Sequence, residues 1–171
     1  MAAPLDPGCI FRVLADNNVE YVLIGGLAAV LHGSTAMTND ADVFPANDAE
    51  NMRNLSAALE DLNARLRTES DPNGVAFDPH PALISSMATL NMTTRCGDLD
   101  MTFTPAGLSS YAGVRDNSIV FEISGCTVQV AALDDIIRSK ESANRAKDHA
   151  TLPILRALKD ELSLGVKDSD G

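Results

Sequence analysis

Hydrophobic residues recur along the chain with two different periods. Apolar residues three or four positions apart indicate a helix, whereas alternating apolar and polar residues, or a short apolar run between turn residues, indicate a strand. The helical period predicts helices at residues 8–18, 27–32, 47–66, 133–143 and 147–162. The alternating period and short apolar runs predict strands at residues 20–24, 39–44, 88–94, 98–103, 118–123 and 127–131.

Local signals refine three of these predictions. Asn47 is expected to cap the helix that follows it, with Glu50 three residues on as its capping-box partner. Ser124-Gly125 lies between two strand-like runs and indicates a hairpin turn. The polar, turn-rich segment 68–74 is expected to be a mobile loop.

The order of the elements predicts the fold class. Helices alternate with strands early, strands dominate the middle of the chain, and helices come last, which favours an α/β (α+β) fold with a mixed twisted sheet flanked by helices. A length of 171 residues suits one domain. We expect a core at 1–131, a C-terminal helical region at 132–165 packed on the same domain, and a disordered tail at 166–171.

The net charge of −11 restricts the partners. Such a chain repels nucleic acid on average, so double-stranded DNA is not expected as a partner. An RNA partner would need a local positive patch.

The cysteines and the apolar runs bear on location. Cys9, Cys96 and Cys126 form an odd set without metal-ligand spacing, so we expect three reduced thiols. The N-terminus does not resemble a signal peptide, and no apolar run approaches the length of a membrane span. These observations predict a cytoplasmic protein with no membrane partner.

The stretch from residue 24 to residue 43 is the richest in chemical signals. A hydrophobic run delivers the chain to Gly25-Gly26, and the next predicted strand presents Asp40 and Asp42. Side chains at i and i+2 of a strand project from the same face, so the two carboxylates could share one metal ion while Ala41 points into the core. A surface pair at a strand end is the plainer alternative.

The residues around this acid pair allow two interpretations. Gly25 and Gly26 would let the backbone approach phosphate oxygens, or would merely permit a tight strand-to-helix turn. Ser34 and Thr38 would donate hydrogen bonds to phosphate, or would cap local turns.

A third acid lies further along the chain. Asp98 and Asp100 follow a glycine bend on a predicted strand and would share a face, so the local pattern does not separate them. A turn-capping role is the alternative for Asp100.

The Gly-Gly turn, the spacer and the Asp-x-Asp pair together resemble the DNA polymerase β-like nucleotidyltransferase superfamily. The run from Gly25 to Asp42 is similar to small bacterial members, including the abortive-infection and toxin–antitoxin nucleotidyltransferases, and the resemblance extends over residues 20–158. It implies that Asp100, with Asp40 and Asp42, holds Mg²⁺ or Mn²⁺.

The resemblance also implies the reaction. An NTP would donate its nucleoside monophosphate to a hydroxyl of RNA, a protein or a small molecule, with release of pyrophosphate. Asp100 would be a metal ligand or the base that activates the acceptor. A toxin-type enzyme would also have a cognate antitoxin.

The C-terminal helices carry a basic segment against the acidic background. Residues 138–159 contain six basic and two acidic side chains. Lys140 and the Arg-Ala-Lys-Asp run that begins at Arg145 resemble motifs of the abortive-infection enzymes. Lys140 is the candidate to neutralise a triphosphate, Arg145 and Lys147 to assist it, and Asp148 to orient Lys140 or Arg145. An ordinary solvated helix face is the alternative.

One departure from the family pattern keeps other functions open. Ala36 stands where small relatives often carry an arginine, which suggests altered specificity or weakened catalysis. A catalytically weak nucleotide-binding or protein-interaction module with the same fold is therefore an alternative. Antibiotic nucleotidylation is another, although the short C-terminal region leaves little room for an aminoglycoside pocket.

Overall fold

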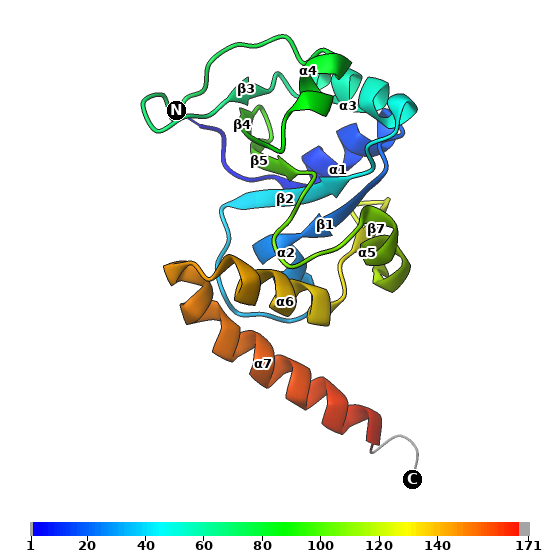
Figure 1. Ribbon diagram of the computed structural model, residues 1–171, viewed down its shortest axis with the longest axis vertical. Helices are drawn as coiled ribbons and strands as arrows, with labels where there is room; N and C mark the ends of the chain where they lie inside the picture. The colour runs from blue at the N-terminus through cyan, green and yellow to red at the C-terminus, as the bar shows by residue number, and fades with distance from the viewer. Residues whose placement is uncertain (1, 168–171) are drawn as a thin grey trace.

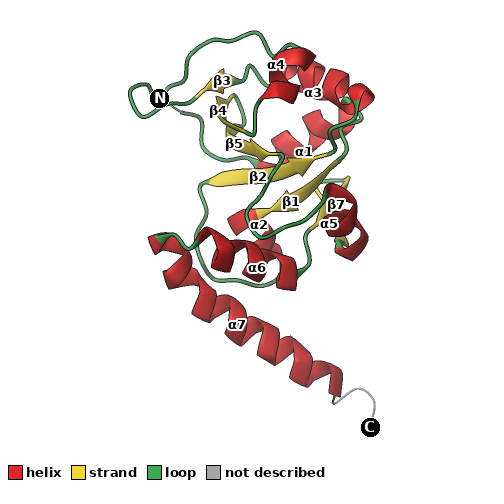
Figure 2. Ribbon diagram, viewed as in Figure 1, coloured by secondary structure: helices red, strands yellow, loops and turns green. Residues whose placement is uncertain are grey.

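The computed structural model describes residues 2–167 and contains a seven-stranded mixed sheet with helices around it (Figure 1). The strands are β1 (Tyr21–Ile24), β2 (Asp40–Pro45), β3 (Arg65–Leu66), β4 (Thr89–Thr94), β5 (Gly97–Thr102), β6 (Ile119–Ile123) and β7 (Cys126–Val130). The helices are α1 (Pro7–Asp16), α2 (Gly25–Leu31), α3 (Ala49–Asp61), α4 (Pro81–Ser86), α5 (Tyr111–Asn117), α6 (Leu133–Ala143) and α7 (Ala146–Lys167). The predicted fold class is confirmed (Figure 2).

The strand order is β3-β4-β5-β2-β1-β7-β6. β2 pairs antiparallel with β1 and parallel with β5, while β1 pairs parallel with β7. The β3–β4, β4–β5 and β6–β7 pairs are antiparallel. This order places β2, which carries the first acid pair, in the middle of the sheet.

The strands at the site separate apolar from polar side chains. The core side of β2, β4 and β5 consists of side chains that are at most 1% exposed: Ala41, Val43, Leu90, Met92, Leu99 and Met101. Because neighbours along a strand point to opposite faces, the aspartates and threonines between them project from the other face. Figure 1 shows α1, α3 and α4 grouped together at one end of the molecule, with α6 and α7 at the other end. The polar face is therefore available for a site.

One turn matches its sequence signal, and one cap does not. The β6–β7 hairpin turns at Ser124 and Gly125, both at positive φ, as the twist of a hairpin favours. The N-cap of α3 is Asp48, whose carboxylate accepts a hydrogen bond from the backbone N–H of Asn51, so the assignment to Asn47 is wrong. Asp caps as well as Asn, and the pattern could not separate adjacent candidates.

The region between α3 and β4 contains structure that the periodicity missed. β3 is only two residues long and α4 only six, so neither is long enough to show a period. The 68–74 segment forms hydrogen-bonded turns, with the N–H of Gly74 donating to the carbonyl of Asp71 at 3.1 Å. Its mobility stays a prediction.

Helix α7 is longer than its apolar pattern indicated. It ends at Lys167 rather than near residue 162, and Figure 1 shows it extending away from the rest of the molecule. The expected tail thus begins inside a helix, and residues 168–171 lie outside the described residues. No helix of the described part, α7 included, combines the length and apolarity that crossing a bilayer requires.

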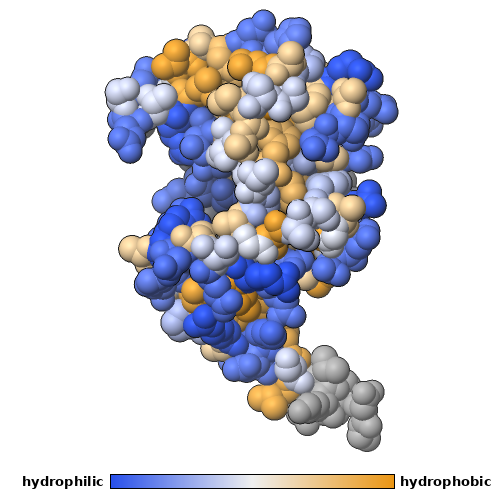
Figure 3. All heavy atoms as spheres, in the orientation of Figure 1, coloured by the Kyte–Doolittle hydropathy of each residue, from blue (hydrophilic) through white to orange (hydrophobic). Residues whose placement is uncertain are grey.

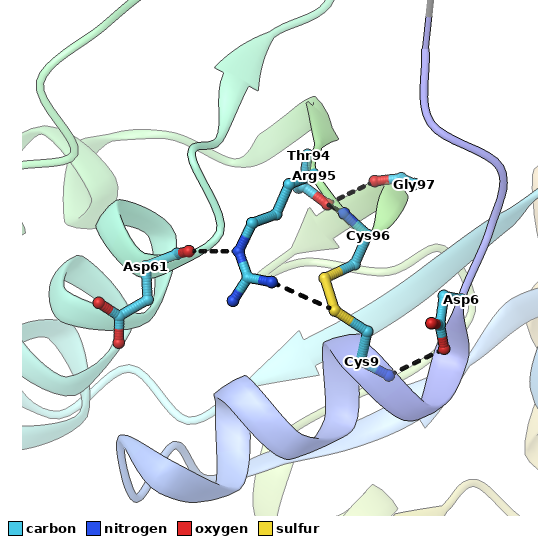
Figure 4. Close-up of a disulfide and its surroundings, with 7 residues drawn as sticks. All are labelled: Asp6, Cys9, Asp61, Thr94, Arg95, Cys96 and Gly97. Atoms are coloured by element: carbon cyan, nitrogen blue, oxygen red, sulfur yellow. Dashed lines mark hydrogen bonds between the residues drawn. A yellow bond between two sulfur atoms is a disulfide. The ribbon is translucent and has the colours of Figure 1, made fainter.

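The expectation of three reduced thiols is wrong. Cys9 on α1 and Cys96 in the β4–β5 turn form a disulfide (Figure 4), while Cys126 is free. The backbone N–H of Cys96 donates to Thr94 Oγ1 at 3.0 Å, which holds the turn in place. The partners are 87 residues apart in sequence, so local spacing could not reveal them. The predicted cytoplasmic location therefore loses the support that reduced thiols gave it.

Candidate active site

The parallel pairing of β2 with β5 brings the three predicted acids together. The register sets Asp42 directly opposite Asp100 and Asp40 opposite Asp98. Carboxylate oxygens of Asp40, Asp42 and Asp100 all lie within 4.8 Å of one another. Two acids from one strand and one from its neighbour thus converge on a common point.

Arg67 contacts both acids of β5 and does not itself separate their roles. It follows β3 and binds both carboxylates, Nη1 pairing with Asp98 and Nη2 with Asp100 at 2.7 Å. Asp98 does not belong to the cluster that could hold a metal, whereas Asp100 does, as the family resemblance implied. Sequence reasoning missed Arg67, because its partners are 31 and 33 residues away and no motif surrounds it.

The first glycine of the turn is required by its contact with the acid pair. Gly25 has φ +71°, and a Cβ there would lie 2.3 Å from Asp42 Oδ2. At Gly26 a Cβ would lie 3.0 Å from Thr38 Oγ1, a tighter but less severe contact. Any side chain at position 25 would therefore displace the Asp42 carboxylate.

Ser34 and Thr38 both make local hydrogen bonds. Ser34 is 8% exposed, and its Oγ accepts from the N–H of Ala36 at 3.2 Å. Thr38 Oγ1 donates to the carbonyl of Asp40 at 3.1 Å and lies 3.4 Å from Asp40 Oδ1. Both therefore shape the segment before β2, and a role in binding phosphate stays a prediction.

The basic residues of α6 and α7 are organised by one buried carboxylate. Asp148 is fully buried; Arg145 Nε donates to its Oδ2 at 2.8 Å, and Lys140 Nζ lies 3.6 Å from its Oδ1. Burial alone would raise the pKa of Asp148, but hydrogen bonds from Arg145 and the charge of Lys140 hold that pKa below its ordinary value. Asp148 thus orients both cations, where the sequence had left the choice between them open.

These groups line a single cavity of about 580 Å³. Its lining includes the two glycines, the three clustered acids and the three cations Lys140, Arg145 and Lys147, together with Ser34, Ala36 and Thr38. Figure 3 shows a hydrophilic hollow between the two ends of the molecule. The acids and the cations therefore share one space, although they come from segments far apart in the sequence.

Two of the clustered acids have raised pKa values, and burial is the main cause. Burial, followed by repulsion from Asp40 and Asp100, raises the pKa of Asp42 to about 7, although Lys147 and Lys140 oppose the shift. Burial also raises the pKa of Asp100 to about 6, against the lowering effect of Arg67. Packing carboxylates this closely is unfavourable unless a cation offsets their charge.

The donor set fits a hard divalent cation. The three converging carboxylates offer only oxygen ligands, which Mg²⁺ and Mn²⁺ prefer, and their mutual repulsion would be relieved by a bound cation. Asp40, Asp42 and Asp100 are the residues that would hold it.

The chain is similar in structure to several nucleotidyltransferases. The sequence matches no protein-family model, and no curated protein matches it. ANT(2")-Ia, solved with adenylyl-2"-tobramycin, aligns with a TM-score of 0.53 and 18% identity over 94% of this chain and 88% of that one. The lincosamide antibiotic adenylyltransferase LnuA, lincomycin-bound, aligns with a TM-score of 0.52 and 15% identity over 91% of this chain and 99% of that one.

A third structure, an antigenic nucleotidyltransferase-like protein from Paracoccidioides brasiliensis, aligns with a TM-score of 0.51 and 17% identity, over 91% of this chain and 79% of that one. The expectation that the short C-terminal region leaves little room for an aminoglycoside pocket stays a prediction. The chain has the nucleotidyltransferase fold.

Proposed function

We propose that the protein is a divalent-metal-dependent nucleotidyltransferase that moves a nucleoside monophosphate from an NTP to a hydroxyl acceptor. The observation that carries the proposal is the cavity in which three converging carboxylates share one space with Lys140, Arg145 and Lys147. An NTP needs both kinds of group, since its triphosphate binds cations of the protein and a metal ion held by acids.

The acids divide the work at the reacting phosphorus. Asp40 and Asp42 would hold the metal, which would supply positive charge to stabilise the triphosphate and the departing pyrophosphate. Asp100 lies beside them, where it can complete the metal site or accept the proton of the attacking hydroxyl. Arg67 fixes one oxygen of Asp100, which limits the directions in which that carboxylate can turn.

The cations and the glycine turn position the triphosphate. Lys140 is 12% exposed at its side chain and is directed by Asp148, so it offers a fixed positive charge beside the cavity. Because Gly25 has no side chain, the chain can turn closely over Asp42 at the end of β1. The turn that would bind the triphosphate therefore lies next to the carboxylate that would bind the metal. These contacts support transfer in spite of Ala36, because positive charge reaches the cavity from α6 and α7 instead.

Label transfer tests this function. Wild-type protein with Mg²⁺ and each of the four α-³²P-labelled NTPs is expected to label an acceptor in a cell extract, while Asp40→Asn and Asp42→Asn abolish the labelling. Asp78→Asn, an exposed acid away from the cavity, is the matched control and is expected to behave as wild type. Equal labelling by wild type and both site variants would eliminate the mechanism.

Calorimetry separates this function from the catalytically weak module. The enzyme is expected to bind an NTP in a Mg²⁺-dependent manner and to release pyrophosphate when acceptor is present. Tight binding without pyrophosphate release in any extract would favour the module. ATP is the first donor to test, because ANT(2")-Ia was solved with adenylyl-2"-tobramycin and LnuA is a lincosamide antibiotic adenylyltransferase. A toxin role with a cognate antitoxin stays a prediction of the family resemblance.

A further inference from the structure

We propose that the acceptor is a small hydroxyl-bearing molecule with no phosphate near its reacting hydroxyl, and that it binds a neutral strip formed by Thr89, Asn91 and Thr102. This inference rests on the proposed function and names the class of acceptor. Three observations carry it: the register of β4 and β5, the distribution of charge around the cavity, and the geometry that displacement at phosphorus requires.

The register places the neutral strip beside the third acid. Asn91 on β4 is directly opposite Asp100 on β5, and Thr89 is opposite Thr102. Residues directly opposite each other across paired strands project from the same face, and all four line the cavity. The hydroxyls of Thr89 and Thr102 lie 3.3 Å apart. The strip therefore continues the polar face of the sheet outward from Asp100.

The charges that line the cavity are separated in space. Across the sheet the order is β4, β5, β2, β1, so the strip and the glycine turn lie on opposite sides of the acids. Within the described residues, the cations that line the cavity all come from the segment between Lys140 and Lys147. Lys140 lies on α6, and α6 packs against α2, the helix that begins at the glycine turn. Helix α6 thus brings positive charge to the side of the glycine turn, and it also reaches Gly107 after β5, while the strip itself contributes no cation.

The geometry of the reaction assigns one substrate to each side. The acceptor oxygen forms its bond to the α-phosphorus as the bond from that phosphorus to the bridging oxygen of the β-phosphate breaks, and pyrophosphate leaves. Attack in line requires the acceptor to approach opposite the leaving group. Since the cations hold the triphosphate on the glycine side, the acceptor lies on the side of Asp100 and the strip. Asp100 takes the proton that the acceptor hydroxyl loses.

A nucleic-acid end fits this side poorly. The phosphate next to a terminal ribose would lie beside Asp100, and its charge needs Lys or Arg for neutralisation. Among the described residues, the cation beside Asp100 is Arg67, which already pairs with Asp98 and Asp100. The strip instead offers hydroxyl and amide groups, which suit the hydroxyls of an uncharged or positively charged small molecule.

Fractionation of the labelled products tests the acceptor class. One cell extract is divided into a low-molecular-mass filtrate, purified RNA and a protein fraction. Each fraction is incubated separately with the enzyme, Mg²⁺ and the α-labelled donor NTP. Label in the filtrate products is expected. Label in RNA or protein overturns the inference, and so does the absence of label from all fractions while calorimetry shows Mg²⁺-dependent NTP binding. Absence of NTP binding would instead contradict the proposed function itself, and with it this inference.

Variants of the strip test its position. With the labelled small acceptor, Asn91→Leu is expected to raise the KM for acceptor about fivefold to tenfold, the effect of losing one hydrogen bond, with the KM for NTP unchanged. Thr89→Val, which keeps the side-chain shape, should shift the acceptor KM in the same direction. Asn73→Leu, an exposed asparagine in the 68–74 segment, is the control. An unchanged acceptor KM, or an equal rise in the KM for NTP, would overturn the assignment.

Discussion

Replacing Asp42 by asparagine should make the metal-free protein more stable while abolishing transfer. The ordinary pKa of this carboxyl is 3.8, and burial with neighbouring acids raises it to about 7 in the folded protein. A raised pKa means that folding favours the protonated form, so the ionised form weakens the fold. The penalty is absent below about pH 4, grows as the pH rises from about 4 to about 7, and is complete above that.

The size of the effect follows from the shift. Each unit of pKa difference corresponds to about 1.4 kcal/mol, so a shift of about three units gives an upper bound of about 4 kcal/mol. Part of the shift is repulsion shared with Asp40 and Asp100, which relax when one charge is removed, so we expect about half of this bound. In a protein of this length, about 2 kcal/mol raises Tm by roughly 4–8 °C.

The assay is thermal unfolding with EDTA at pH 8 and at pH 5. Asp42→Asn should unfold at a higher temperature than wild type at pH 8, and the difference should shrink at pH 5. Mg²⁺ should raise the Tm of wild type at pH 8 more than that of the variant, because the metal relieves the same repulsion. Asp78→Asn should match wild type throughout. A variant less stable than wild type at pH 8 without metal, or a gain independent of pH, would refute the reasoning.

Three further changes test contacts that support the site. Gly25→Ala should lower stability by about 1–3 kcal/mol and abolish transfer, because a Cβ there meets Asp42; unfolding and label transfer measure both, and full activity would contradict the contact. Asp148→Asn should destabilise the protein by about 3 kcal/mol in denaturant unfolding, since it leaves Lys140 without its buried partner; a neutral result would show that the pair is dispensable. Cys9→Ser should lower Tm in non-reducing buffer, because it removes a cross-link across 87 residues that contributes about 4 kcal/mol. Its Tm should match that of the reduced wild type. Equal Tm values for the variant and the wild type in non-reducing buffer would contradict the cross-link.

The sequence predicted the parts of the site that depend on local order. Strand periodicity placed Asp40 and Asp42 on one face of a strand, and the glycine pair marked the turn that packs on Asp42. Asp100 needed more than periodicity, because Asp98 has the same local pattern. The family resemblance selected Asp100, and the physical reason is the register of β2 with β5, which sets it opposite Asp42.

What the sequence did not show depends on contacts between distant segments. Arg67 reaches its two carboxylates from a turn-rich region, and the disulfide joins α1 to the β4–β5 turn; in both cases the tertiary fold alone brings the partners together. The short elements β3 and α4 have too few residues to display a period. The error at Asn47 has a different cause, since two neighbouring residues could each cap the same helix.

Binding of Mn²⁺, followed by its EPR signal in the presence of a non-hydrolysable NTP analogue, tests the central claim most directly. Wild type should bind the ion, and Asp40→Asn, Asp42→Asn and Asp100→Asn should each weaken that binding, while Asp78→Asn leaves it unchanged. Undiminished binding in all three site variants would show that these carboxylates do not form the metal site on which the proposed chemistry depends.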